Sequence, residues 1–394
     1  MSLAKRSPAS QFLALPVGQG DAFYLRQGDA SALIDGGRSF HGLERMLSTN
    51  AKADQLDVIV CSHNDADHAL GLLGLLSAGF PCREVWLPGS WTTRMDNLLT
   101  KPAAFLAELI QNIKEIPELG GDVPEQGLLE VFGSRLVADN QYQEGEQPTE
   151  RITHALEVAL ESDDWPIRGY PLFQIPNFEA PILIPLMMPP NPRARLLMEG
   201  VAATARIREI AVAAHANGAR IRWFHFDAPV SVPPSRTDLL RGVNCGEIAR
   251  IPAAHPSALF YLALSVANKE SLVFQTRTVG APGVLFTADS DLAFGGSIDW
   301  DQPLLITAPH HGSEANAHAY KRFSNEGLSC PGTKIWVRSD GRFRKRPGPS
   351  YLKTQSRFCT RCRGQDGPAQ LVEFRTNRGQ WAKGLMRSCV CVND

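Results

Sequence analysis

The sequence lacks several features that would assign it to common classes of protein. No apolar run is long enough to cross a membrane, and the nearest, Phe178–Met188, is interrupted by prolines and by Glu179. The first residues carry Lys5 and Arg6, but the apolar segment after them is too short for a secretory signal. No glycine-rich loop precedes Gly-Lys-Ser or Gly-Lys-Thr, which excludes a P-loop nucleotide site. We therefore expect a cytoplasmic protein without a membrane partner.

Internal repeats and long low-complexity tracts are also absent. The chain has 394 residues, and its hydrophobic content of 43% is ordinary for a globular protein. This length allows one large domain or two ordinary ones, each with a sizeable core.

The net charge of −1 conceals an uneven distribution of charged residues. From Pro331 to Asp394 there are fourteen Lys or Arg and four Asp or Glu, a charge of +10 that leaves −11 on the rest. The densest basic segment is Arg342–Arg346, and aromatic residues lie within and after it. Such a segment suits a polyanion such as nucleic acid. A solubilising face, or an arm that docks on the acidic body, is the alternative.

The most informative feature is a short loop that is rich in metal-binding side chains. An apolar run, Leu56–Val60, predicts a buried strand, and residues 69–76 predict a helix. Between them lie four candidate ligands within six residues: His63, Asp65, Asp67 and His68. Imidazole and carboxylate groups together suit Zn²⁺ or Mn²⁺. A loop between a strand and a helix can present such ligands as an open site. A polar loop without function is the alternative.

Further segments predict strands that border on potential ligands. Val17–Ala22 and Ala32–Gly37 predict two linked strands, the second of which ends in Asp35. Gly283–Asp289 predicts a strand that ends in a carboxylate, and Leu304–Ser313 one that ends in paired histidines. We expect these ligands to lie along one edge of a sheet, which argues against the polar-loop alternative.

In this order the motifs resemble those of the metallo-β-lactamase fold and, within it, of the soluble hydrolase domain of ComEC-type DNA-uptake proteins. The family pattern reads VGQGD, a strand ending in DxG, SHxDxDHxxG, NxxSLV, a strand ending in GD, and PHHGS. The matching segments here are Val17–Asp21, Asp35–Gly37, Ser62–Gly71, Asn268–Val273, Ala288-Asp289 and Pro309–Ser313. The resemblance covers approximately residues 10–90 and 260–340.

The resemblance implies an α/β (α+β) fold, an αββα sandwich of two mixed sheets with helices outside. The core would comprise residues 1–90 and 251–340, interrupted by an insertion at 91–250 and followed by a basic, cysteine-containing extension at 341–394. The insertion carries no family motif. It would serve as a lid, as a substrate-selecting cap, or as the contact for a protein partner or a second copy of the chain. The family's membrane channel is not covered, so DNA import is not expected.

The resemblance also implies a dinuclear centre. His63 and Asp65 would bind one metal ion, and Asp67 and His68 the other. Asp289 would bridge the two ions. The remaining assignments are His310 as a further metal ligand, Asp35 as the residue that orients His63, Asp67 and His311 as catalytic residues, and His311, Ser313 and Asn268 as contacts to substrate phosphate.

Such a centre predicts a metal-dependent hydrolase. Two ions about 4 Å apart can hold a bridging hydroxide, polarise a phosphoryl oxygen and stabilise the leaving oxygen. The resemblance favours a phosphodiesterase or nuclease acting on DNA or RNA, and a setting in bacterial defence. A small-molecule phosphodiesterase or lactone hydrolase is one alternative. A binding or regulatory module with weakened catalysis is the other, because Gly348 stands where the family usually has histidine.

Four of the eight cysteines form two close pairs near the C-terminus. Cys359 and Cys362 make a CxxC pair, and Cys389 and Cys391 a CxC pair. Four thiolates are enough for a closed tetrahedral zinc site. Free or redox-active thiols are the first alternative, and disulfides are the second, which the cytosol disfavours.

The residues between the two pairs suggest how they could meet. Leu371–Arg375 predicts a strand, and Thr376–Gly379 predicts a turn. A hairpin would bring the two cysteine pairs at its ends together. A structural zinc ion there would fix Arg361 and Arg363, which we predict to bind substrate phosphate.

Overall fold

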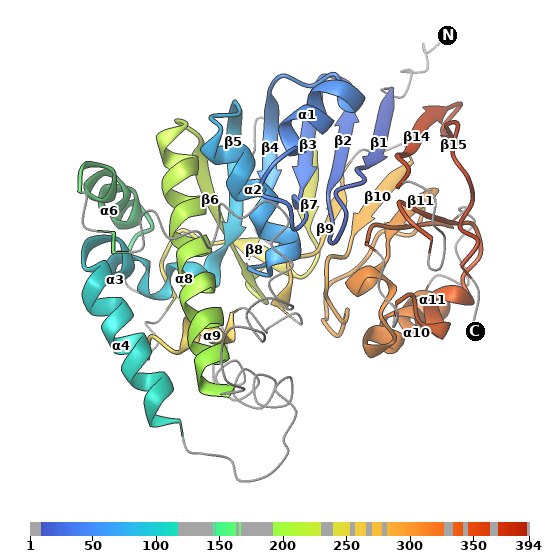
Figure 1. Cartoon of the computed structure of the whole chain (residues 1–394). Coiled ribbons are helices and arrows are strands. Elements are labelled where there is room, and N and C mark those ends of the chain that lie inside the picture. The colour runs from blue at the N-terminus through green and yellow to red at the C-terminus, as the bar shows by residue number, and fades with distance from the viewer. Residues whose placement is uncertain are drawn as a thin grey trace.

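Two β-sheets packed face to face form the centre of the molecule, and helices cover both outer faces (Figure 1). The computed structural model describes residues 9–116, 145, 147–162, 165–166, 192–229, 239–252, 257–264, 270–277, 282–326, 334–341, 346–362 and 369–391. Within these residues the architecture is the expected αββα sandwich.

The larger sheet has nine strands in the order β15-β14-β1-β2-β3-β4-β5-β6-β8. Its strands are β1 (Ser10–Ala14), β2 (Phe23–Gln27), β3 (Ala30–Ile34), β4 (Leu56–Val60), β5 (Cys82–Pro88), β6 (Arg220–Phe226), β8 (Cys245–Glu247), β14 (Val372–Asn377) and β15 (Gln380–Lys383). Strands β3 to β6 are parallel to one another, and the others join the sheet in antiparallel pairs.

The smaller sheet has six strands in the order β13-β12-β11-β10-β9-β7. They are β7 (Leu240–Gly242), β9 (Phe274–Thr276), β10 (Gly283–Phe286), β11 (Leu304–Thr307), β12 (Lys334–Arg338) and β13 (Arg357–Cys359). Strands β10 to β13 are parallel. Parallel strands need covered faces on both sides, which accounts for their nearly continuous apolar sequences.

Helices cover the two outer faces unequally. The face of the nine-stranded sheet is covered by α1 (Leu43–Met46), α2 (Ala66–Ser77), α3 (Met95–Thr100), α4 (Pro102–Glu115), α6 (Glu150–Glu161), α8 (Pro192–Ala216) and α9 (Phe260–Ala263). The face of the six-stranded sheet is covered by α10 (Ala317–Glu326) and α11 (Pro349–Leu352). None of the helices in the described part of the chain is long and apolar enough to cross a membrane.

The side-chain period of the strands divides the core into three layers. In β1, Phe12 and Ala14 face the other sheet, whereas Leu13 faces the helices. In β10, Val284 and Phe286 face the central layer, and Leu285 faces α10. Successive side chains of a strand point to opposite faces, so both faces of each sheet become apolar.

The predicted segment boundaries do not coincide with the sheets. Strands β6 and β8 come from the predicted insertion at 91–250, yet they extend the nine-stranded sheet beyond β5. The hairpin β14–β15 comes from the predicted extension at 341–394 and pairs with β1. Phe374 and Trp381 of this hairpin are buried between the sheets. Burial of these aromatic side chains makes the hairpin part of the core.

Candidate metal centre

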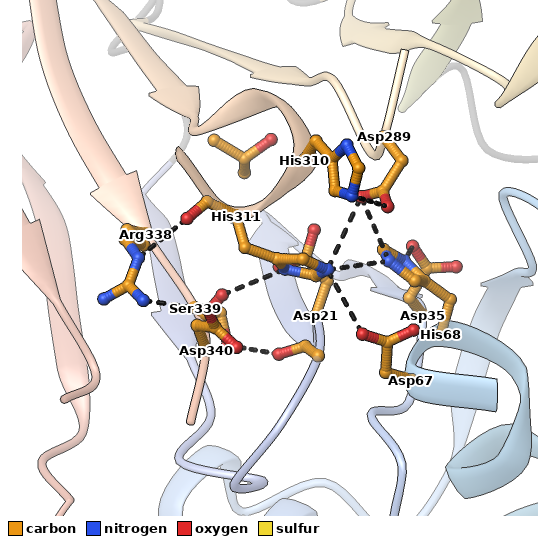
Figure 2. Close-up of polar contacts among 12 residues, drawn as sticks. Asp21, Asp35, Asp67, His68, Asp289, His310, His311, Arg338, Ser339 and Asp340 are labelled. Carbon is orange, nitrogen blue, oxygen red and sulfur yellow. Dashed lines mark hydrogen bonds and ion pairs between the residues drawn. The ribbon is translucent and has the colours of Figure 1, made fainter. Parts of the chain in front are cut away.

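The candidate ligands converge at one edge of the sandwich. His63 and Asp65 lie between β4 and α2, and His68 lies in the first turn of α2. Asp289 follows β10, and His311 follows β11. The carboxyl ends of parallel strands share an edge, so residues distant in sequence face one another there (Figure 2).

Asp289 lies at the middle of this arrangement. Its Oδ1 atom is 3.2 Å from Nε2 of His68 and 3.5 Å from Nε2 of His311. Its Oδ2 atom is 3.9 Å from Nε2 of His63 and 3.5 Å from Nε2 of His310. The carboxylate therefore faces four imidazole nitrogens, two on each oxygen (Figure 2 labels three of these histidines).

Two groups of ligand atoms share Asp289. One group contains His63, Asp65 and Asp289, and the other contains Asp21, His68, Asp289 and His311. Within each group the ligand atoms all lie within 4.8 Å of one another. Asp67 borders the second group, because its Oδ2 is 3.4 Å from Nε2 of His311. Imidazole and carboxylate sets of this size can hold divalent metal ions.

Each histidine of the centre has a second partner that orients its ring. Nδ1 of His68 is 2.8 Å from Oδ2 of Asp35, and Nδ1 of His311 is 3.1 Å from the Ser339 carbonyl oxygen. Carboxylate and carbonyl oxygens only accept hydrogen bonds, so these partners assign the proton to Nδ1. Each Nε2 then faces Asp289, where a bound cation would take the lone pair of that nitrogen. Such outer partners are characteristic of metal-binding histidines.

The rings of His63 and His310 are also oriented through Nδ1, by polar side chains. Nδ1 of His63 is 2.9 Å from Oγ of Ser62, whose hydroxyl donates to Asp35 at 2.7 Å. Nδ1 of His310 is 3.3 Å from Oδ1 of Asn316. The Asn316 amide nitrogen donates to two backbone carbonyls, which fixes Oδ1 as the acceptor.

Several buried atoms of the centre have no hydrogen-bond partner among the described residues. They are Nε2 of His63, Oδ1 of Asp289 and Oδ2 of Asp21. Buried polar atoms are almost always satisfied, and an unsatisfied one requires an explanation. Three such atoms within one His/Asp cluster fit a site for cations.

The charges of the cluster are strongly coupled. Burial raises the pKa of Asp289, but His310, His311 and His68 outweigh burial and hold that pKa well below its usual value. Burial lowers the pKa of His68 and His311, but the carboxylates, Asp289 foremost, raise both well above the usual value. Metal ligands must be deprotonated, so a bound cation would replace these protons.

Glycines allow the surrounding backbone segments to approach the ligands. A Cβ atom on Gly20 would lie 1.7 Å from the carbonyl oxygen of Asp67, and the φ of Gly20 is +98°. A Cβ atom on Gly71 would lie 1.9 Å from the Gly36 carbonyl oxygen. Both glycines belong to the motifs that carry the family resemblance, and both hold α2 against the loops before β2 and after β3.

Substituting Gly71 with alanine should destabilise the protein. Alanine favours helices by about 1 kcal/mol over glycine, but the clash is with backbone, which cannot rotate away. Overpacking of this kind typically costs about 1–3 kcal/mol, so the melting temperature should fall. Gly295→Ala is the matched control, because no atom lies within 4 Å of an added Cβ there and its φ is ordinary. Equal melting temperatures for the two variants would contradict the close approach of α2.

The structure differs from the sequence-based assignment of two residues. His311 was expected to contact substrate, but its side chain is 0% exposed and its Nε2 lies among the ligand atoms. Asp35 was expected to orient His63, but it contacts His68 directly and reaches His63 only through Ser62. Asp21 was not assigned any role, although it belongs to one ligand group.

Ser313, Asn268, Arg361 and Arg363 were predicted to contact substrate phosphate, and the structure describes two of these four residues. Oγ of Ser313 accepts a hydrogen bond from the Ala315 amide at 3.3 Å and so begins a short helical turn. The carbonyl oxygen of Arg361 accepts a hydrogen bond from Arg338. Asn268 and Arg363 lie outside the described residues, as does most of the basic segment 342–346.

Gly348, the position at which the sequence resemblance implies a histidine, lies beside the His310–His311 turn. Its amide donates to the Gly312 carbonyl oxygen at 2.8 Å. A Cβ atom at this position would lie 2.7 Å from Cβ of Glu314 and 2.8 Å from its backbone nitrogen. The space that a histidine would need is thus filled by Glu314.

Some basic residues of the C-terminal part have partners inside the molecule. Arg338 is 1% exposed, and it donates to the His311 carbonyl oxygen and to Asp340. Nη1 of Arg357 donates to the carbonyl oxygens of Leu352 and Thr354. The positive charge of this part is therefore not all available to a polyanion.

Comparison with known proteins supports the fold. The family model described as the metallo-beta-lactamase superfamily matches residues 15–137. No curated protein matches the chain. The structure adds a second sheet, the candidate ligands Asp289 and His311, and His310 beside Asp289, all of which lie beyond the matched residues. The fold is an αββα sandwich of the metallo-β-lactamase type, with a buried His/Asp cluster that can bind metal ions.

Proposed function

We propose that this protein is a metal-dependent hydrolase that cleaves phosphodiester bonds of nucleic acid at a dinuclear centre. One observation carries the proposal: two groups of ligand atoms share the Asp289 carboxylate. A shared carboxylate is what holds two ions at the short separation, about 4 Å, that phosphoryl transfer requires. The superfamily whose family model matches consists mostly of metal-dependent hydrolases, which agrees with this chemistry.

The candidate ligands would form two sets, one for each metal ion. His63, Asp65 and His310 would hold one Zn²⁺ or Mn²⁺ ion on Oδ2 of Asp289. Asp21, Asp67, His68 and His311 would hold the other on the Oδ1 side. Two such ions, when bound, supply a nucleophilic hydroxide and neutralise charge on the phosphate.

Residues that hydrogen-bond to the ligand side chains would hold these side chains in position. Asp35 and the Ser339 carbonyl oxygen hold His68 and His311 by Nδ1, and Asn316 holds His310. Fixed rings lower the cost of reorganisation when charge develops on the phosphate. Buried surroundings would also exclude water from the ligand side of the ions, which strengthens their field.

The choice of nucleic acid as substrate rests on charge and on the resemblance to ComEC-type hydrolase domains. The last 64 residues carry a net charge of +10, and their densest basic segment begins just after Gly341. Gly341 itself lies close to the Gln19 backbone, beside the ligand Asp21. We infer that the basic residues next to Gly341 in the sequence bind the phosphate backbone.

A direct assay tests the proposal. Purified protein, freed of metal and reloaded with Mn²⁺ or Zn²⁺, should cut plasmid DNA, single-stranded DNA or RNA, and a chelator should stop the reaction. Cleavage of a chromogenic phosphodiester or a lactone without cleavage of nucleic acid would instead indicate a small-molecule hydrolase. Measuring bound metal in the same samples separates an inactive apo-protein from an inactive loaded one.

One observation favours a second candidate, a binding or regulatory module with weakened catalysis. Glu314 occupies the space of the histidine that the family usually has at position 348. A protein that binds metal fully but hydrolyses none of these substrates would support this second candidate.

A further inference from the structure

A second group of ligand atoms lies near the C-terminus. The Sγ atoms of Cys359, Cys362, Cys389 and Cys391 all lie within 4.8 Å of one another, and three of the four side chains are buried. Tetrahedral zinc with Zn–S bonds of about 2.3 Å places its sulfur ligands roughly 3.8 Å apart. The four atoms therefore lie close enough to surround one ion, and the sulfur atoms of Cys359 and Cys362, 3.1 Å apart, would separate slightly on binding it.

The surroundings of these sulfur atoms differ from those of ordinary core cysteines. Among the described residues, the buried cluster consists of Cys359, Cys362 and Cys391, with Leu352 and Cys389 packed against it. One aliphatic side chain does not account for the meeting of three buried thiols. The Val390 amide points at Sγ of Cys362 at 3.4 Å, a contact that favours a thiolate acceptor.

The four cysteines connect segments that belong to different sheets. Cys359 ends β13 at the edge of the six-stranded sheet. The chain then crosses to the nine-stranded sheet, forms the hairpin β14–β15 beside β1, and returns (Figure 1). On its return the Cys389 amide donates to the Arg357 carbonyl oxygen at 2.8 Å. An ion held by both cysteine pairs would fasten this returning segment to β13 and so tie the two sheets together.

Arg338 links the cysteine cluster to the metal centre. Its Nη1 donates to the Arg361 carbonyl oxygen, inside the CxxC pair, at 3.1 Å. Its Nε donates to the His311 carbonyl oxygen at 2.7 Å. His310 and His311 have φ values of 47° and 53°. Such left-handed backbone is strained in residues other than glycine and persists only where neighbours hold it.

We propose that the four cysteines bind one structural zinc ion, which fastens the C-terminal segment to β13 and steadies Arg338 behind the His310–His311 turn. This inference does not depend on the proposed hydrolase activity, because an inactive protein would need the same ion. Zinc prefers such a closed set of four thiolates, and it stabilises the fold by binding only the folded arrangement.

Cobalt substitution tests the site in the unaltered chain. Reduced full-length protein, stripped of metal and refilled with Co²⁺, should show the intense near-ultraviolet charge-transfer absorption that thiolate ligands produce. Nitrogen and oxygen ligands of the His/Asp centre do not produce this band. Absence of the band would overturn the proposal. So would the loss of four titratable thiols in denatured, unreduced protein, because the sulfur atoms would then form disulfides.

A zinc count in variants provides the second measurement. In an Asp289→Asn background, which disables the His/Asp centre, the protein should retain about one zinc per chain. In that background, adding Cys359→Ser and Cys362→Ser should remove the zinc and lower the melting temperature. In the chain with an intact Asp289, the same two substitutions should weaken Mn²⁺ binding at the His/Asp centre. Cys82→Ser is the matched control, since Cys82 is a free cysteine outside the cluster. An unchanged zinc count in the double-serine protein would reject the site.

Discussion

Replacing Asp289 with asparagine should disrupt both halves of the metal centre and abolish metal-dependent hydrolysis. Within the described residues, Asp289 belongs to both mixed His/Asp ligand groups. An amide offers one coordinating oxygen and no charge, so one group loses its ligand and both lose a negative charge. Replacing a residue that hydrogen-bonds to a metal ligand typically lowers activity by about 10- to 100-fold. The loss in Asp289→Asn should be larger.

Metal content measures this effect independently of activity. Apo-protein incubated with excess Mn²⁺ or Zn²⁺ and then desalted should hold about two ions per His/Asp centre in the parent and fewer than one in the variant. Asp301→Asn is the matched control, because Asp301 is exposed and lies outside both ligand groups. Parent-like metal content in Asp289→Asn, with the fold intact by circular dichroism, would show that Asp289 is not a bridging ligand.

Sequence analysis predicted that candidate ligands and their orienting residue follow strands, and the topology explains why they meet. Asp35 follows β3, His63 follows β4, Asp289 follows β10 and His311 follows β11. Each pair of strands is parallel, so the ends that carry ligands meet at the same edge. Local sequence is sufficient for such a prediction, because a buried strand followed by polar residues is a short-range pattern.

Asp21 was given no role because a strand was predicted over Val17–Ala22, whereas β2 begins at Phe23 and Asp21 precedes it. Strand β2 is antiparallel to β3, and Phe23 at its start pairs with Ile34 at the end of β3. The start of β2 therefore lies at the same edge as Asp35. The signal was present in the glycine-rich segment before β2, but its use requires knowing the direction of the neighbouring strand, which the residues around Asp21 do not encode.

The pairing of strands that are far apart in the sequence could not be predicted either. Strand β14 was expected as part of a hairpin between the cysteine pairs, and the hairpin exists, but its pairing with β1 joins segments more than 350 residues apart. The very short strand β8 gave no local signal at all. The convergence of the four cysteines was predictable, because a hairpin brings its own ends together.

The role of His311 could not be read from its motif. Two adjacent histidines in an extended strand would point to opposite faces. Here both residues adopt left-handed backbone, and both Nε2 atoms face Asp289. The conformation depends on Arg338 and on the Gly348 amide, which bonds to Gly312 beside the turn. Both partners lie far along the chain, so the sequence of the motif alone does not show that both rings face Asp289.

Replacing Asp35 with asparagine should weaken metal binding without emptying the centre. Asp35 is 0% exposed and accepts three hydrogen bonds: from the Ser62 amide at 2.8 Å, from the Ser62 hydroxyl at 2.7 Å and from Nδ1 of His68 at 2.8 Å. Asparagine has one acceptor oxygen. If that oxygen keeps the Ser62 amide, an NH₂ group faces Nδ1 of His68 and forces the ring proton onto Nε2, where the metal should bind.

The expected change is an about 10- to 100-fold loss of metal affinity, measured by titrating Mn²⁺ into apo-protein. Stability should also fall by about 1–3 kcal/mol, because buried donors lose their acceptor. Asp57→Asn is the control: Asp57 accepts hydrogen bonds from the amide and hydroxyl of Ser31, both on Oδ2, and has no histidine partner among the described residues. The single oxygen of asparagine can keep both of these bonds, so only Asp35→Asn should lose stability and Mn²⁺ affinity. Equal Mn²⁺ affinities in the two variants would mean that the tautomer of His68 does not depend on Asp35.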